Sequence, residues 1–198
     1  MITSHHPLEY IASLLEEILL EYDVKKFLVL ITDNAPNMRK ATKMLETKYP
    51  HLVSFGCFAH SLHLLCQDIL KSTSVANILI HTKNIIKNIN GSQVLIGAFN
   101  EVKKELHSQK SLVLPVATRW GSHVASLISL VKCKQVLQRM AIDEKYLEKM
   151  DKPVRIKSLD EDYWLKVSDL INILQPTTNW ITKLESDKPT IEYVSSVL

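Results

Sequence analysis

The chain has 198 residues, of which 46% are apolar, and it carries 24 Lys and Arg against 21 Asp and Glu. This length and apolar fraction suffice for a folded core, and they exclude a disordered, collagen-like or low-complexity chain. No stretch approaches the ~18 uninterrupted apolar residues of a membrane span, and the N-terminus lacks a secretory signal pattern. Because 3 Cys residues are an odd number, we expect a reducing compartment and a protein that is neither secreted nor membrane-bound.

The charge is unevenly distributed along the chain. Residues 81–139 carry 9 basic and 2 acidic side chains, residues 1–80 carry 7 and 8, and residues 140–198 carry 8 and 11. A basic middle segment suits a surface that faces phosphate groups. A solvated, Lys-rich helix face explains the same pattern equally well.

The first 58 residues show an alternation of helix and strand. Apolar residues at helical spacing predict an amphipathic helix over 7–22, and the apolar run Phe27–Ile31 predicts a strand buried on both faces. Pro36 suits the first turn of a second helix, which ends near Pro50, and Leu52–Phe55 predicts a second strand. This order is typical of one crossover unit of a parallel sheet.

From His60 onward the pattern is helical almost throughout. Only Leu112–Leu114 suggests a short extended piece, and Pro176 marks a break. We therefore expect an α/β plus α fold, with a partial α/β core over 1–58 and a mainly helical domain over 59–198. The predicted helices cover 61–71, 74–89, 92–108, 121–141 and 161–184.

Asp33 is the first candidate for chemistry. It follows a predicted strand, at the edge where open α/β sheets place ligands, and a carboxylate there can hold a hard cation such as Mg²⁺. The alternative is a capping role at the following helix, which contributes about 1 kcal/mol.

Cys57, His60, His63 and Cys66 are residue types that bind zinc. On one continuous helix, however, successive steps of three residues turn the side chains apart, so the four cannot converge on one ion. We expect His63 and Cys66 to face the core instead.

The pair Arg119-Trp120 is a third candidate. A guanidinium beside an indole offers a phosphate ligand next to a stacking surface, which suits nucleic acid. The alternative is a half-buried Trp with a local ion pair of the Arg. The chain has no Gly-rich phosphate loop and no other motif that indicates a small-molecule substrate.

Three motifs occur in an order that closely resembles the hAT-superfamily transposases. They are the run Leu30–Met38 with its Thr-Asp-Asn-Ala signature, the C-x-x-H run Cys57–Leu64, and the Arg-Trp pair that ends Pro115–Trp120. A looser match extends from Trp180 to Val197.

The resemblance implies an RNase H-like core that is interrupted by a helical insertion domain. It also implies metal-dependent DNA strand cleavage and transfer by three acids with Mg²⁺ or Mn²⁺. Asp33 corresponds to the second acid, which is both catalytic and a metal ligand. Cys57 and His60 correspond to the pair that supports the site, and Arg119 and Trp120 correspond to the DNA-binding pair.

The first and third acids of the family have no counterpart in this sequence. We therefore expect an internal fragment that is catalytically incomplete by itself, since one acid cannot bridge two metal ions. By resemblance it would be nuclear or nucleocytoplasmic, would bind DNA weakly and in a salt-dependent manner, and would form homo-oligomers through regions missing here. Two alternatives are a domesticated helical protein-interaction module without DNA chemistry, and nonspecific nucleic-acid binding through residues 81–139.

Overall fold

The structure is a computed structural model that describes residues 8–116 and 120–186. The chain divides into two compact units, residues 1–64 and residues 65–198. The predicted domain boundary after residue 58 lies at the start of helix α3 (Phe58–Lys71) and stays a prediction.

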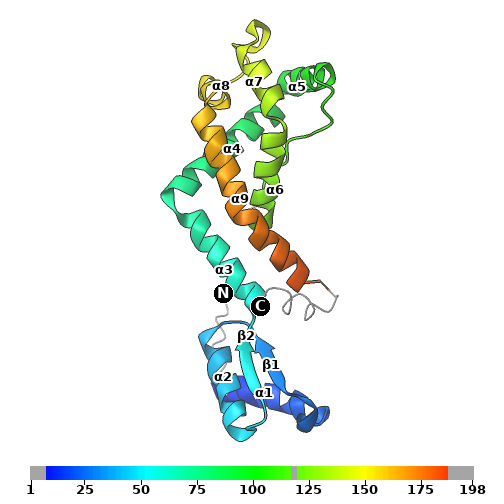
Figure 1. The fold of residues 1–198 in the computed structure, drawn as a ribbon, viewed down its shortest axis with the longest axis vertical. Helices are drawn as coiled ribbons and strands as arrows, with labels where there is room; N and C mark the ends of the chain where they lie inside the picture. The colour runs from blue at the N-terminus through cyan, green and yellow to red at the C-terminus, as the bar shows by residue number, and fades with distance from the viewer. Residues whose placement is uncertain (1–7, 117–119, 187–198) are drawn as a thin grey trace. The chain divides into compact units, whose positions relative to one another are not determined.

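The first unit is a small α/β layer (Figure 1). Strands β1 (Val29–Thr32) and β2 (Val53–Gly56) pair in parallel, and the register sets Val29 opposite Val53 and Thr32 opposite Gly56. Helix α2 (Pro36–Lys48) connects them, and helix α1 (Leu8–Glu21) and the short helix η1 (Val24–Lys26) precede β1. The predicted order of helix, strand, helix and strand is confirmed, with bounds that shift by one or two residues.

Helices α1 and α2 enclose a small core with one face of this sheet. Leu19, Leu45 and Leu52 are buried, and Leu30 of β1 packs against them together with Leu15, Val24, Phe27 and Tyr49. Glu16 ties the two helices together, because it pairs with Lys48 at 2.6 Å and accepts a hydrogen bond from the Tyr49 hydroxyl.

The prediction that the first strand is buried on both faces is wrong. Alternate residues of a strand point to opposite faces, so Leu30 faces the helices while Val29 and Ile31 face away. Ile31 is 68% exposed and Phe55, its partner in the register, is 57% exposed. The described residues thus leave one apolar face of the sheet uncovered.

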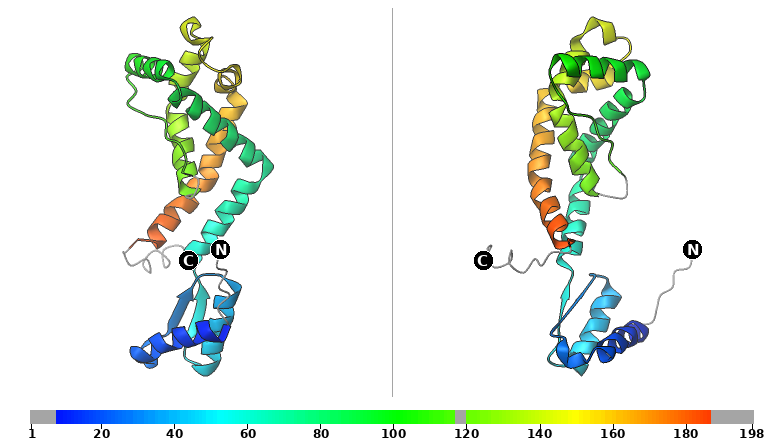
Figure 2. Two further views of the ribbon diagram at one scale, coloured as in Figure 1. Left: turned by 180° about the vertical axis from the view of Figure 1, so that it is seen from behind. Right: turned by 90° about the vertical axis from the view of Figure 1, so that its right-hand side faces the viewer.

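The second unit is helical (Figure 2). Helix α9 runs beside α6, and α4 contacts both of them, so that the three surround a continuous core. Its helices are the remainder of α3, then α4 (Thr73–Asn90), α5 (Gln93–Glu105), α6 (Trp120–Lys132), α7 (Lys134–Ile142), η2 (Glu144–Tyr146), α8 (Lys152–Ser158) and α9 (Glu161–Leu184). Cys66 is fully buried in this core, as predicted.

Three predicted features of this unit differ in the structure. The helix expected over 121–141 is two helices, which Cys133 separates. Residues 112–114 form no strand, although Val113 N–H donates to the Ser129 hydroxyl at 3.0 Å. Helix α9 continues through Pro176, because Leu174 and Ile181 are buried on either side and their packing offsets the one lost backbone hydrogen bond. None of the described helices has both the length and the apolar character of a membrane span.

The two faces of β1 provide a test of this packing. We expect Leu30→Ala to lower the free energy of unfolding by about 2 kcal/mol, because Leu30 packs on the small core. Ile31→Ala at the adjacent, exposed position should cost less than about 1 kcal/mol. Urea unfolding of both variants measures the difference, and equal losses would show that the outer face is also packed.

Candidate functional site

The candidate site lies at the carboxyl edge of the two parallel strands. Thr32 and Gly56 are register partners at the strand ends, so the next residues, Asp33 and Cys57, leave the sheet at the same edge. The Cys57 N–H donates to the Thr32 carbonyl at 2.6 Å and extends the pairing by one bond. Two of the sequence motifs therefore meet here, as parallel pairing requires.

The N-cap residue of α2 is Ala35, with no side-chain cap bond, so the capping alternative does not hold for Asp33, which is exposed. Its Oδ1 accepts a hydrogen bond from Ala35 N–H at 3.0 Å, just before α2 begins at Pro36. This turn directs the chain from β1 into α2. The role of Asp33 as a metal ligand and catalytic acid stays a prediction.

Asn34 joins the two motifs directly. Its Nδ2 donates to the Cys57 carbonyl at 3.2 Å and to the Ser61 hydroxyl at 2.8 Å. The same carbonyl accepts from Ser61 N–H at 3.1 Å as the first bond of α3. Gly56 makes this approach possible, because a Cβ at that position would lie 1.8 Å from Asn34 Oδ1.

Cys57 and His60 lie at the start of α3, and both are half-buried. The Cys57 thiol is free. Its backbone, rather than its thiol, makes the contacts that join α3 to the sheet. How these two side chains support a reaction stays a prediction.

The donor set at this edge does not by itself fit Mg²⁺ or Mn²⁺. These hard cations prefer several oxygen ligands, and two-metal chemistry requires acids that bridge the ions, whereas Asp33 supplies one carboxylate. Over the described ranges, no three His, Cys, Asp or Glu side chains gather as metal ligands would.

The DNA-binding pair predicted from the sequence cannot be compared with the structure in full. Arg119 lies outside the described residues, and Trp120 is the first residue of α6, with a side chain that is also outside them. One turn later, burial and the nearby Lys83 ammonium lower the pKa of His123. His123 is therefore neutral at pH 7.

A polar hollow of about 240 Å³ lies beside the carboxyl edge. We call it the strand-end hollow; Thr32, Arg39, Thr42, Lys43, Glu46, Ser54, Phe55 and Gly56 line it. Glu46 accepts hydrogen bonds from the Ser54 N–H at 2.5 Å and the Ser54 hydroxyl at 2.7 Å, and it pairs with Lys43 at 2.7 Å. The bonds from Lys43 and Ser54 lower the pKa of Glu46 to about 2, so this carboxylate holds β2 to α2 as an anion.

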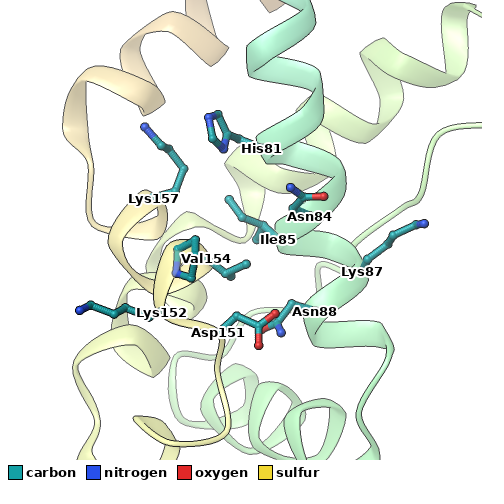
Figure 3. A pocket seen from close by; sticks show the side chains of 10 residues that line it. His81, Asn84, Ile85, Lys87, Asn88, Asp151, Lys152, Val154 and Lys157 are labelled. Carbon is teal, nitrogen blue, oxygen red and sulfur yellow. The ribbon is translucent and has the colours of Figure 1, made fainter.

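A larger pocket of about 580 Å³ lies in the helical unit, between α4 and the start of α8 (Figure 3). Figure 3 shows the Lys87 and Lys152 side chains extending in opposite directions. Lys157 pairs with Asp160 at 2.7 Å, and Asp151 adds a negative charge to the lining. The pocket therefore offers no set of converging cations.

The sequence pattern predicts a turn or cap role for Asn34, and it assigns no role to Gly56 or Ser61. All three residues lie inside or next to the motifs at Leu30–Met38 and Cys57–Leu64, and this position is the sequence feature that indicates a role for them. The sequence interpretation also missed Glu46, whose signal is Lys43 three residues earlier on the same helix face. Nothing in the sequence pattern indicates the bond from Glu46 to Ser54.

Comparison with known proteins gives two family matches. Residues 55–173 match the ZBED1 RNase-like helical domain, which is more than half of the chain. The chain belongs to this family. Residues 2–85 match a domain of unknown function, DUF659.

One curated relative supports the ZBED1 RNase-like helical domain assignment. The chain is 27% identical over 150 residues to the zinc finger BED domain-containing protein RICESLEEPER 3 of Oryza sativa subsp. japonica. The match covers 69% of this chain and 20% of the relative, so the chain spans about a fifth of that protein's length. No solved structure matches the chain. These matches support a hAT-like, transposase-related protein.

The contact between Gly56 and Asn34 generates a prediction. We expect Gly56→Ala to destabilise the first unit by about 1–3 kcal/mol, because the added Cβ displaces Asn34 and its two hydrogen bonds. Gly97→Ala is the control, since apart from its chain neighbours and the backbone of its own helix nothing lies within 4 Å of that Cβ, and a helical Gly→Ala change gains ~0.5–1 kcal/mol. Amide hydrogen exchange in each unit measures the effect, and wild-type protection of β2 in Gly56→Ala would contradict it.

The low pKa of Glu46 predicts a specific dependence of stability on pH. A carboxyl group with a lowered pKa stabilises the fold above its unfolded value, 4.5, and the contribution disappears as the pH falls toward about 2. We expect Glu46→Gln to melt below the wild type at about pH 6 and together with it at about pH 2. Glu17→Gln, at an exposed position of α1, is the control. If the melting temperature of Glu46→Gln lies below that of the wild type by the same amount at both pH values, the stabilising role of the ionised Glu46 carboxylate is contradicted.

Proposed function

We propose that this chain is part of a hAT transposase-like protein that cleaves and transfers DNA strands with the help of divalent metal. The observation that carries the proposal is the carboxyl edge of the sheet. There a strand-end acid, Asp33, lies one residue from Asn34, which binds the start of the C-x-x-H segment at the Cys57 carbonyl. Open α/β sheets place reacting groups at such edges.

In this proposal Asp33 is a metal ligand for Mg²⁺ or Mn²⁺ and a catalytic acid. Cys57 and His60 position the adjacent chain, and Arg119 and Trp120 hold DNA. Two-metal strand transfer needs further carboxylates besides Asp33, because one acid cannot bridge both ions. The chain by itself is therefore catalytically incomplete.

We further propose that the first unit is part of an RNase H-like core. A parallel pair of strands is too small to be stable as an isolated sheet. The outer face of this pair is apolar, with Ile31 and Phe55 exposed, and it suits coverage by further elements of such a core. A nuclear protein that binds DNA and forms homo-oligomers is the corresponding setting, and the BED zinc finger named in the rice relative is consistent with it.

DNA binding and nicking together test the proposal. We expect weak binding of a labelled duplex in fluorescence anisotropy that falls steeply as salt rises, because phosphate neutralisation would drive it. With Mg²⁺ or Mn²⁺ we expect no nicking of supercoiled plasmid by the chain alone.

Asp33→Asn is the matched variant, because it keeps an oxygen that accepts from Ala35 N–H and removes the charge. Absence of DNA binding at low salt would overturn the proposal. A different outcome is that the wild type nicks the plasmid in the presence of metal while Asp33→Asn does not. That result would support metal-dependent DNA cleavage at Asp33 and would refute the proposal that the chain by itself is catalytically incomplete.

A further inference from the structure

Among the described residues, one basic side chain that lines the strand-end hollow has no hydrogen-bond or ion-pair partner. Glu46 binds Lys43 and Ser54, the Thr42 hydroxyl donates to the Arg39 carbonyl, and the Thr32 hydroxyl donates to the Asp33 carbonyl. Arg39 lines the hollow from α2, and in the part of the chain that the structure describes its guanidinium has no hydrogen-bond or ion-pair partner.

The hollow is positively charged overall. Its charged side chains are Arg39, Lys43 and Glu46, and the Glu46 carboxylate is already bound by Lys43 and Ser54. Lys43 is 77% exposed and keeps N–H donors for a second acceptor. A guanidinium fork beside a second cation matches the oxygens of a phosphate group.

The hollow also lies next to the strand ends that form the candidate site, where a bound DNA phosphate would be close to Asp33. Thr32 and Gly56, the last residues of the two parallel strands, form one side of it, and Asp33 follows directly. A ligand here would lie between α2 and the carboxyl-terminal ends of the strands, next to the edge where open α/β sheets place ligands.

We propose that the strand-end hollow binds a phosphate group of the DNA backbone, with Arg39 as its main ligand and Lys43 as a second one. This inference rests on the proposed function and adds a binding residue to that site. The larger pocket of the helical unit does not carry the same inference, because its lysines diverge or are paired with acids.

Arg39→Ala tests the site, and Lys40→Ala is its matched control. Lys40 is the neighbouring exposed cation on α2 and does not line the hollow. We expect Arg39→Ala to weaken binding of a labelled oligonucleotide about tenfold, and Lys40→Ala to weaken it less than about twofold. Arg39→Lys keeps the positive charge but loses the two parallel N–H donors of the guanidinium, so its affinity for the oligonucleotide should lie between those of the wild type and Arg39→Ala. Circular dichroism checks that each variant folds.

The Arg39 side-chain N–H signal in NMR identifies the source of the phosphate. We expect an unlabelled oligonucleotide to shift this signal at concentrations where inorganic phosphate does not. A shift by inorganic phosphate that the oligonucleotide neither produces nor displaces would overturn the DNA-backbone assignment.

The two proposals fail differently. Equal DNA binding by Arg39→Ala and Lys40→Ala, with wild-type binding intact, overturns the hollow and leaves the proposed function standing. Absence of DNA binding by the wild type at low salt overturns the proposed function itself.

Discussion

The geometry of the candidate site depends on one side-chain amide, that of Asn34. Its two N–H donors bind two oxygen acceptors on the other motif, the Cys57 carbonyl and the Ser61 hydroxyl. An aspartate at this position would present an acceptor to the Cys57 carbonyl and would add a second negative charge beside Asp33. The amide can approach only because residue 56 has no side chain. The order Asp-Asn after β1 and Gly-Cys at the end of β2 therefore has a physical reason: the first pair supplies the acid and the amide donor, and the second supplies the space and the carbonyl acceptor.

In the described part of the chain, helices cover only one face of the small sheet, and this asymmetry bears on its polar carboxyl edge. On its inner face, Leu30 packs against the helices, and Glu46 of α2 binds the Ser54 N–H and hydroxyl of β2. A half-buried backbone N–H needs an acceptor, and here a carboxylate of the connecting helix supplies it. The helix that crosses between the strands thus also fixes their position. Helix α2 therefore holds the two strands from one face of the sheet. The carboxyl edge, with Asp33 and the strand-end hollow, stays accessible to ligands.

Much of the fold follows from local patterns. Short apolar runs and turn residues predict α1, β1, α2 and β2 within two residues, because each is specified by its own sequence. The outer face of β1 could not be predicted, since a continuous apolar run is the same whether or not something covers both faces. The division of the helix at Cys133 and the continuation through Pro176 are decided by core packing rather than by local propensity. At the site, the sequence identified Asp33 and Cys57 as candidates, but their meeting at one edge required the register of β1 with β2. Arg39 is a charged residue on the solvent side of α2, and only the position of that helix beside the strand ends distinguishes it from Lys40.

The charges at this edge also constrain how DNA would be held. Asp33 and Arg39 carry opposite charges and lie on the same short stretch of chain, while Glu46 is neutralised by Lys43. The edge therefore exerts little long-range attraction on a polyanion, and the affinity of the hollow for phosphate has to come from short-range, directional hydrogen bonds of the guanidinium. In our proposal, long-range attraction comes from the basic segment 81–139, which carries 9 basic and 2 acidic side chains. We propose that the two parts contribute differently: the segment raises the rate of encounter with DNA and the salt dependence of binding, whereas Arg39 holds one phosphate near Asp33. This division explains why loss of a single cation at the hollow should affect binding more than loss of its equally charged neighbour.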